Sequence, residues 1–495
     1  MKRTMPHAPM TFTDQGVTTY RQFIAGRWED AAGDPLDVTN PATGDIVGRV
    51  QMATEDDAEK ALQAADKAFA TWRRTTAKYR ADLLLDLVSR LQDDAERLAR
   101  LITSEQGKPL TESRADVGMC ADLIRFAAEH TRRLEGDIVP ADDPDEQIWI
   151  QKVPHGVVVG ITAWNFPAAL IGRKLGPALA AGNTIVLKPS EETPLTAMEI
   201  VELARKAGIP DGVINIVNGY GKEVGNHLVT HDKTQLVSMT GSVRGGREIN
   251  KAAAPHLKLV RLELGGKAPF IVMDDADMEP AVEAAIVSRF SNNGQVCTCN
   301  ERMYVHEGIY DAFLKRFKER VEELKVGDPL AHEDVDMGPK INSGELDKVH
   351  DMVQRAIDQG AHLETGGEKL TGGEYDKGFY YAPTVLTGVS NDMEIMQEEI
   401  FGPVVPIMKV ESFEQALSYA NVSQYGLSAY VFTTNIKRLM TTVHDLDFGE
   451  IYVNRGGGES VQGFHKGYRN SGIGGEDGKY GLEAYVKNKT MYVHF

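Results

Sequence analysis

Two rhythms of apolar and polar residues divide the chain. Between about residues 54 and 134 the apolar positions recur every three or four residues, which is typical of amphipathic helices. This spacing predicts helices over residues 54–69, 80–102 and 112–134. Thr54 is a suitable N-cap for the first helix, and Gly107 with Pro109 ends the second. We interpret this stretch as packed helices.

From Val157 onward, short apolar runs alternate with helical segments. They predict buried strands at 157–161, 184–188, 213–217 and 236–239, with helices at 168–180 and 193–206. After Pro269 the rhythm repeats, with a strand at 270–273 and helices at 278–290, 310–324 and 344–359. Strands that alternate with helices predict mostly parallel sheets. We therefore expect two three-layer α/β domains with a cleft near Glu263–Lys267.

Strict alternation of apolar and polar residues marks two further stretches. Residues 135–154 contain two short alternating runs bounded by prolines, and residues 489–494 contain another. Isolated hairpins are marginal in water, so these strands need a partner. They are either ordinary edge strands of one sheet or an arm that contacts a second subunit.

Composition narrows the class of protein. The 495 residues carry a formal net charge of −18, which argues against non-specific nucleic-acid binding. No apolar run reaches the length of a membrane span, and residues 1–17 are expected to form a loose head. Three cysteines in a chain of this length indicate reduced thiols and a cytoplasmic location. Because Cys297 and Cys299 have no second ligand pair at metal spacing, no metal site is predicted.

One stretch carries the strongest chemical signal, Phe290-Ser-Asn-Asn-Gly-Gln-Val-Cys-Thr-Cys299. A glycine shortly before Cys297 can expose backbone N–H groups and present a thiolate. Glu263 lies 34 positions earlier in Leu262-Glu-Leu-Gly-Gly-Lys-Ala-Pro269, and Trp164-Asn-Phe-Pro167 comes earlier still. In order and spacing these motifs resemble the NAD(P)-dependent aldehyde dehydrogenase superfamily from about Phe23 onward. The C-terminal half is similar to bacterial lactaldehyde and glycolaldehyde dehydrogenases.

The resemblance and the chemistry of the residues together assign catalytic roles. Cys297 is the expected nucleophile, and Glu263 is the expected base that activates water to hydrolyse a thioester. The Asn165 amide, with the Cys297 backbone N–H, is expected to stabilise the oxyanion. Lys174 matches a family lysine near the water-activating relay, and Glu476 matches a distal glutamate. Ala163 departs from the family proline, and we expect only a local change there.

The cofactor signal is distributed over several segments, and no GxGxxG is present. Backbone N–H groups at the start of a helix after Thr240 can hold a pyrophosphate, and Lys188 can donate to ribose hydroxyls. Glu191 can accept from the ribose 2′-hydroxyl and would repel a 2′-phosphate, which favours NAD over NADP. The cofactor residues implied by the resemblance are Trp164, Lys188, Ser190, Glu191, Gly221, Gly225, Gly241, Ser242, Leu264, Glu399 and Phe401.

Three polar residues match substrate-facing positions of lactaldehyde dehydrogenases: Arg173, Glu459 and His465. Such a pocket suits a short polar aldehyde of the lactaldehyde or glycolaldehyde type. Succinate semialdehyde and sulfolactaldehyde are the alternatives. The first is disfavoured because succinate semialdehyde dehydrogenases usually place an arginine where this chain has Ser291. The run Gly456–Gly458 departs from the lactaldehyde pattern and leaves the loop shape open.

The resemblance also implies a domain organisation and an assembly. Residues 18–134 and 155–264 are expected to form a Rossmann-like NAD-binding domain, and residues 265–450 a catalytic domain, with 451–483 returning along the cleft. Residues 135–154 and 484–495 correspond to an oligomerisation arm. This arm predicts a homodimer or a homotetramer.

The combined hypothesis is a hydrolytic, NAD-dependent aldehyde dehydrogenase. The proposed base Glu263 argues against a CoA-acylating enzyme, which has less need to activate water. Two other classes stay open: a thiol esterase without redox chemistry, and a binding protein that keeps the fold. Only a dehydrogenase would produce NADH, so absorbance at 340 nm distinguishes the three.

Overall fold

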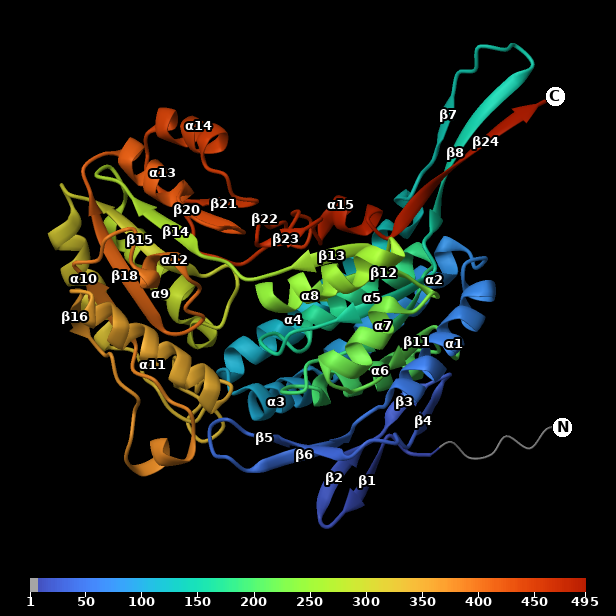
Figure 1. The fold of residues 1–495 in the computed structure, drawn as a ribbon, viewed down its shortest axis with the longest axis horizontal. Helices are drawn as coiled ribbons and strands as arrows, with labels where there is room; N and C mark the ends of the chain where they lie inside the picture. The colour runs from blue at the N-terminus through green and yellow to red at the C-terminus, as the bar shows by residue number, and fades with distance from the viewer. Residues whose placement is uncertain (1–7) are drawn as a thin grey trace.

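A computed structural model describes residues 8–495 of the chain (Figure 1). The expected loose head therefore falls partly outside the described residues, at positions 1–7. Its remainder differs from the expectation, because β1 (Thr11–Asp14) pairs antiparallel with β2 (Val17–Tyr20). Together with β5 (Pro35–Thr39) and β6 (Ile46–Gln51), these strands form a four-stranded sheet in the order β1-β2-β6-β5.

An eight-stranded sheet organises the first half of the chain. At its centre β9 (Val157–Ile161) lies parallel to both β10 (Thr184–Lys188) and β12 (Thr234–Thr240). The full order is β23-β13-β12-β9-β10-β11-β3-β4. The outer strands are β11 (Ile214–Ile216), β13 (Leu259–Glu263), β3 (Gln22–Ile24), β4 (Arg27–Glu29) and β23 (Gly472–Ile473).

Both faces of this sheet are covered by helices, as the continuous apolar strands require. On β9 the side chain of Val158 enters one core and that of Val159 the other. The first core contains residues of α2 (Ala77–Asp93), α3 (Ala95–Gln106), α4 (Leu110–His130), α5 (Ala169–Ala181) and α6 (Leu195–Lys206). The second contains residues of α1 (Glu55–Trp72), α7 (Asn226–Thr230) and α8 (Val243–Ala253).

The single helix predicted over residues 80–102 is wrong, because the chain forms two helices there. They meet at Asp94, whose φ of −105° and ψ of 10° are not helical. Asp94 ends α2 and precedes α3, and its carboxylate accepts hydrogen bonds from the Arg97 guanidinium. Aspartate competes with the helix backbone for hydrogen bonds and favours such ends.

A seven-stranded sheet organises the second half, in the order β16-β17-β18-β15-β14-β20-β21. Its strands are β14 (Ala268–Val272), β15 (Asn300–His306), β16 (His362–Thr365), β17 (Thr384–Thr387), β18 (Val404–Val410), β20 (Ser428–Phe432) and β21 (Glu450–Val453). One face packs on α9 (Met278–Phe290) and α10 (Tyr310–Glu322). The other packs on α11 (Ser343–Asp358) and α13 (Phe413–Asn421), with α14 (Ile436–Asp445) beside α13. The predicted α/β fold class is confirmed.

The two sheets are linked by four residues, 264–267, which connect the end of β13 to the start of β14. On the return path β23 pairs antiparallel with β13, so the C-terminal segment runs beside this crossing (Figure 1). Residues at the ends of the parallel strands of both sheets therefore meet at one place. This is where ligands bind in open α/β sheets.

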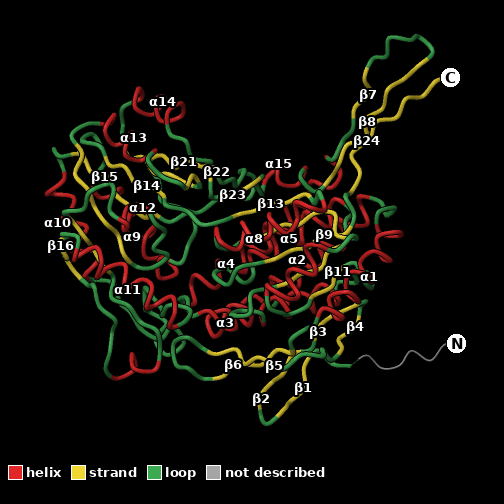
Figure 2. Tube along the Cα trace, viewed as in Figure 1, coloured by secondary structure: helices red, strands yellow, loops and turns green. Residues whose placement is uncertain are grey.

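A separate three-stranded sheet projects from the first half of the chain (Figure 2). It contains β7 (Asp137–Val139), β8 (Glu146–Pro154) and β24 (Val486–His494), in the order β24-β8-β7. The last strand pairs with β8 along its whole length, from Val486 opposite Pro154 to His494 opposite Glu146. Apolar side chains on this arm stay exposed, with Ile138 at 76%, Tyr492 at 69% and Phe495 at 70%. In the described part of the chain no helix is long and apolar enough to cross a bilayer.

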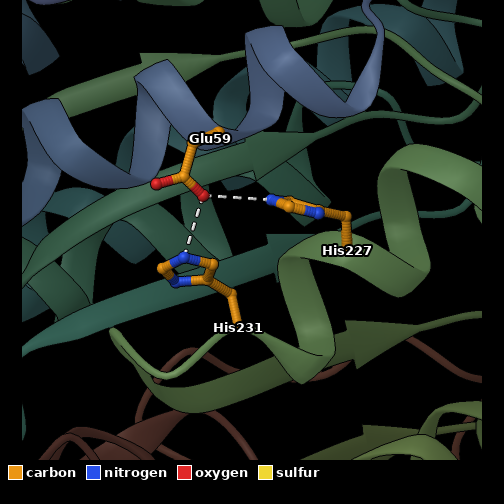
Figure 3. Close-up of side chains that lie close together, drawn as sticks. All are labelled: Glu59, His227 and His231. Atoms are coloured by element: carbon orange, nitrogen blue, oxygen red, sulfur yellow. Dashed lines mark hydrogen bonds and ion pairs between the residues drawn. The ribbon is translucent and has the colours of Figure 1, made fainter.

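Helix α1 is tied to α7 by a cluster of side chains at the surface. The rings of His227 and His231 both point at one oxygen of Glu59, with N–O distances of 3.3 and 2.8 Å (Figure 3). The Lys233 N–H donates to Nδ1 of His231. Nε2 of that ring therefore carries the proton that it donates to Glu59. This contact anchors the chain directly after the π-helical segment Gly221–Gly225.

Candidate active site

A single cavity of about 430 Å³ lies where the two halves meet. Its lining brings together most of the residues predicted for chemistry: Trp164, Asn165, Arg173, Gly241, Ser242, Glu263, Leu264, Cys297, Glu399, Phe401 and Glu459. Lys174 and His465 do not line it but contact acidic side chains beside it. The remaining predicted residues, Lys188, Ser190, Glu191, Gly221 and Gly225, lie around the carboxyl end of β10.

The loop that presents Cys297 has an unusual backbone. Asn292, Asn293 and Gly294 are consecutive residues with φ of 49°, 57° and 68°. Asparagine tolerates this left-handed region better than other non-glycine residues, and glycine adopts it freely. A Cβ on Gly294 would lie 2.3 Å from the Gly402 carbonyl oxygen, so glycine is required there. The Asn-Asn-Gly sequence thus determines the turn before the thiol.

Buried hydrogen bonds hold this turn in place. The backbone N–H of Asn292 donates to Glu112 at 2.8 Å, and its side-chain amide donates to the Asn165 carbonyl at 3.0 Å. The Gln295 side chain accepts from the backbone N–H of Ile341 at 3.0 Å. The position of Cys297 therefore depends on segments of both halves of the chain.

The two cysteines of the loop have different surroundings. Cys297 is partly exposed to the cavity, and its pKa is raised by burial, an effect that His465 opposes. Cys299 is buried, and its thiol donates to the Val296 carbonyl at 2.8 Å. Burial raises the pKa of Cys299 to about 12, so it stays protonated at neutral pH. Only Cys297 is placed to react with a molecule in the cavity.

Glu263 is the last residue of β13 and its side chain is only 3% exposed. Among the described residues neither carboxylate oxygen has a hydrogen-bond partner. Burial raises the pKa of Glu263 to about 8, and the nearby His465 opposes the rise. The nearest cationic group is His465, whose Nε2 lies 3.4 Å from Oε2. An unpartnered buried carboxylate at a cavity is poised to exchange a proton with water.

The Asn165 side chain is anchored at the rim of the cavity. One amide hydrogen is donated to the Gln295 carbonyl at 3.0 Å. An asparagine amide carries two hydrogens, so a second donor is left for a ligand in the cavity that Asn165 lines. The backbone places this donor on the same cavity wall as the Cys297 loop.

Lys174 belongs to a fully buried network behind the cavity. Its ammonium pairs with Glu476 and donates to the Thr240 hydroxyl at 2.8 Å. Glu476 also accepts from Ser238 at 2.8 Å. Burial lowers the pKa of Lys174. For Glu476, burial favours the protonated form, but Lys174 and Arg173 outweigh it and lower the pKa. Lys174 and Glu476, matched only by resemblance in the sequence, are thus direct partners.

The predicted cofactor residues form two groups. At the end of β10 the Lys188 ammonium lies 3.1 Å from Glu191, and the Gly225 backbone lies against the Lys188 side chain. Next along the sheet edge, Ser242 caps α8 by accepting from the Gly245 N–H at 3.1 Å. Leu264 packs on Gly246, where a Cβ would lie 2.6 Å from its side chain. An exposed helix N-terminus at the carboxyl ends of parallel strands suits a pyrophosphate.

Glu399 and Phe401 form the opposite wall. Glu399 accepts from the Gly266 N–H at 2.8 Å, and burial raises its pKa to about 7. A Cβ on Gly265 would lie 2.5 Å from the same carboxylate, so the crossing segment passes close to it. Phe401 has φ of 54°, and its ring packs edge-on against Trp164 at 5.5 Å. Strained residues of this kind gather at ligand sites because the surrounding structure fixes them.

Among the three predicted substrate residues, Arg173 already has a strong partner. Its guanidinium forms a two-pronged contact with Asp477, at 3.1 and 2.7 Å. Glu459 lines the cavity and lies 3.8 Å from His465. Burial favours protonated Glu459, but His465 and Arg173 outweigh it, so its pKa is lowered and it is a carboxylate at neutral pH.

Two residues of the site escaped the sequence analysis. Asp477 fixes Arg173, and Glu450 accepts from Nδ1 of His465 at 3.0 Å. Asp477 follows the relay residue Glu476, but nothing in the sequence links it to a position about 300 residues earlier. Glu450 offered a weak signal, because it is a carboxylate at the start of an apolar strand.

A partly exposed thiol, a buried carboxylate and an anchored amide share a cavity between a Rossmann-like sheet and a second α/β sheet. This combination defines an NAD(P)-dependent oxidoreductase of the thiol type. A family model described as Aldehyde dehydrogenase family matches residues 28–491, and the chain belongs to this family. The resemblance inferred from the motifs and the prediction of an enzyme are both confirmed.

Relatives align along nearly the whole chain. A 3,6-anhydro-alpha-L-galactose dehydrogenase of Vibrio sp. (strain EJY3) is 50% identical over 96% of this chain and 99% of its own. The lactaldehyde dehydrogenase of Escherichia coli (strain K12) is 44% identical, covering 95% and 98%. A solved structure of 3,6-anhydro-L-galactose dehydrogenase in complex with NAP has a TM-score of 0.94, with 50% identity and coverage of 96% and 100%. The crystal structure of the Escherichia coli lactaldehyde dehydrogenase also has a TM-score of 0.94, at 44% identity and coverage of 96% and 99%.

Proposed function

We propose that the protein oxidises a short hydroxylated aldehyde to its carboxylic acid by a hydrolytic route. One observation carries the proposal. The Cys297 thiol and the unpartnered carboxylate of Glu263 line the same cavity as two polar side chains, Arg173 and Glu459. A thiol and a water-activating base serve acyl transfer to water. The polar pair serves recognition of hydroxyl groups.

In this proposal each step belongs to a named residue. Cys297 attacks the aldehyde carbon and forms a thiohemiacetal, which becomes a thioester on oxidation. The second amide hydrogen of Asn165 and the backbone N–H of Cys297 stabilise the oxyanion. Glu263 then takes a proton from water, and the resulting hydroxide releases the acid from Cys297. Lys174, held by Glu476, contributes positive charge behind the base.

The residues on the sheet edge fit a nicotinamide dinucleotide. The α8 N-terminus with Ser242 suits the pyrophosphate, Lys188 and Glu191 suit the adenosine ribose, and Glu399 suits the second ribose. When bound, the dinucleotide supplies the hydride acceptor. Leu264, Trp164 and Phe401 would pack around the nicotinamide end.

For the choice of cofactor we propose NAD over NADP, because the Glu191 carboxylate would repel a 2′-phosphate. Lys188 partly offsets that repulsion, since it pairs with Glu191 at 3.1 Å. One similar structure is described with NAP, and a relative of Thermoplasma acidophilum is a D-glyceraldehyde dehydrogenase (NADP(+)). We therefore expect a preference for NAD with measurable use of NADP.

For the substrate we propose a hydroxyaldehyde such as lactaldehyde or glycolaldehyde. The names of the relatives support this class, since anhydrogalactose, lactaldehyde and D-glyceraldehyde dehydrogenases are all similar to the chain. Succinate and sulfolactaldehyde-type anionic aldehydes are the second candidates. A succinate-semialdehyde dehydrogenase of Escherichia coli is 39% identical. The Glu459 carboxylate would repel an anion, which favours the hydroxylated class.

The assembly follows from the arm. We propose that residues 135–154 and 484–495 pair with a second subunit in a homodimer or homotetramer. The support is the exposed apolar surface on Ile138, Tyr492 and Phe495, which a partner would cover. In the same proposal residues 18–134 with 155–264 bind the cofactor, residues 265–450 carry the thiol, and residues 451–483 return along the cleft. The three free thiols support a reducing, cytoplasmic location.

The test is NADH or NADPH formation from purified protein with glycolaldehyde, lactaldehyde, succinate semialdehyde, sulfolactaldehyde and propanal. Preference for the hydroxyaldehydes with NAD is the expected result. Preference for the anionic aldehydes would reassign Arg173 and His465 to an anion site. If no aldehyde produced a reduced dinucleotide while esters were hydrolysed, the thiol esterase alternative would replace the proposal.

A further inference from the structure

His465 is placed to do more than face a substrate. Its side chain is 1% exposed and its backbone is clamped in a two-way pairing with Glu476, at 2.9 and 2.7 Å. Nδ1 bonds to Glu450 at 3.0 Å, while among the described residues Nε2 has no hydrogen-bond partner. Nε2 instead faces Glu263 and lies close enough to the Cys297 thiol to lower its pKa. The ring therefore bridges the two groups that the proposed reaction uses.

Glu450 has the bonding pattern of an ionised acid that orients an imidazole. One carboxylate oxygen bonds to Nδ1 of His465, and the other accepts from the Tyr452 hydroxyl at 2.9 Å. A carboxylate at Nδ1 fixes the ring so that Nε2 is the nitrogen that exchanges a proton with a nucleophile. The order thiol, imidazole, carboxylate is the arrangement that activates weak nucleophiles in general.

The surroundings of His465 favour its charged form. The ionisable groups that face it come from several elements: Cys297 in its loop, Glu263 on β13, Glu450 on β21, Glu459 in the preceding loop, Arg173 on α5, and Glu476 and Asp477 before α15 (Gly478–Glu483). Most of them are acids. Burial alone would lower the pKa of His465, but Glu450 and Glu263 raise it well above its usual value. A proton placed on this ring is therefore stabilised.

We propose that His465 takes the proton of the Cys297 thiol, that Glu450 positions the ring for this step, and that Cys297 reacts as a thiolate paired with an imidazolium. The S–H bond breaks as an N–H bond forms at Nε2 of His465, and Sγ then bonds to the aldehyde carbon. When water cleaves the thioester, the C–S bond breaks and the proton returns from Nε2 to Sγ. Glu263 separately takes the proton of the attacking water. This inference rests on the proposed function and adds a second proton carrier to it.

The test measures the thiol itself and needs neither aldehyde nor dinucleotide. Cys297 is alkylated with iodoacetamide between pH 5.5 and pH 9.5, and the rate is compared in the wild type, His465→Gln and Glu450→Gln. Cys297→Ser identifies the modified residue, since Cys120 and Cys299 are buried. Glutamine is the matched replacement because its amide keeps hydrogen bonding without holding a proton.

The expected wild-type profile keeps a reactive plateau below pH 7. His465→Gln should lose that plateau and move the inflection upward by at least about one pH unit, so the rate at pH 6.5 falls by about ten-fold or more. Glu450→Gln should shift the inflection in the same direction by less. A His465→Gln profile within two-fold of the wild type at every pH would overturn the proposal. If His465→Gln fails to fold, the Glu450→Gln profile decides in the same way.

A second measurement separates proton transfer from recognition of a substrate hydroxyl. With a relay, His465→Gln lowers kcat equally for glycolaldehyde and for propanal, which has no hydroxyl. A rise in KM for glycolaldehyde alone, with an unchanged alkylation profile, would assign His465 to substrate binding and overturn the relay. A shifted alkylation profile with no NADH from any aldehyde would support the relay and refute the proposed function. The two failures are therefore distinguishable.

Discussion

A buried ionic cluster supports the wall of the cavity formed by Glu399 and Phe401. The Glu301 carboxylate accepts from four donors: the Lys267 ammonium at 2.9 Å, the Arg289 guanidinium at 3.0 Å, and the N–H groups of Ile400 at 2.8 Å and Phe401 at 3.0 Å. All three charged side chains are at most 1% exposed. Glu301→Gln keeps the shape of the side chain but removes its charge and places an amide N–H₂ among donors.

The size of the effect follows from these contacts. Burial favours protonated Glu301, but Lys267, Arg289 and the Ile400 N–H outweigh it and lower the pKa to about 2. Removing one member of a buried charge cluster costs about 3–5 kcal/mol, because the remaining charges lose their counter-ion. At roughly 2 °C per kcal/mol for a domain of about 200 residues, Tm should fall by about 6–10 °C. Loss of the two backbone contacts should also loosen Phe401 and raise KM for the dinucleotide.

The loss should depend on pH in a stated direction. Burial already lowers the pKa of Lys267 to about 8 beside Glu301, and removing the carboxylate lowers it further. In the variant Lys267 therefore becomes neutral at lower pH than in the wild type, which relieves part of the penalty as pH rises. The difference in Tm between the two proteins should be largest near pH 6 and smaller near pH 9.

Thermal unfolding at fixed protein concentration and scan rate measures this difference. Lys267→Met in the Glu301→Gln background is the matched control, since it removes the ammonium that titrates. The double variant should be more stable near pH 6 than Glu301→Gln alone and should lack the pH dependence. A Glu301→Gln protein whose Tm stays within about 2 °C of the wild type at both pH values would refute the reasoning.

Four further predictions concern the site and the arm. Because the pKa of Glu263 is about 8, thioester hydrolysis should accelerate as pH rises through that value, and Glu263→Gln should give a burst of NADH without turnover. Arg173→Ala should raise KM for glycolaldehyde more than for propanal and, by stranding buried Asp477, lower Tm; equal KM effects would contradict its role. Glu191→Gln should improve kcat/KM with NADP about ten-fold relative to NAD. Deleting residues 486–495 should give a smaller assembly by light scattering, because β8 loses its paired strand.

The sequence predicted the elements that local rules control. The strand Thr184–Lys188 and the helix Met278–Phe290 have the bounds expected from their apolar runs and from the glycine and proline beside them. The break at Asp94 was missed because the apolar spacing continues across it. A single aspartate outweighs that spacing only where its side chain finds local donors, and periodicity does not record such contacts.

Long-range pairing limited what could be predicted of the site. Motif spacing brought Cys297, Glu263 and Asn165 together because these positions lie at strand ends and turns. The partners that set their protonation, Glu450 and Asp477, lie on segments whose meeting depends on the crossing between the sheets. No local pattern encodes which buried acid meets which buried base.

Glu263 and Glu301 show what the fold adds to the residue type. Both are glutamates near the start or end of a strand, and both are almost fully buried. Glu301 accepts four hydrogen bonds, and its pKa is about 2. Glu263 accepts none among the described residues, and its pKa is about 8. Neighbouring carboxylates whose environments drive their pKa values apart have different tasks. The satisfied carboxylate stabilises the cavity wall, and the unsatisfied one is left free to move a proton.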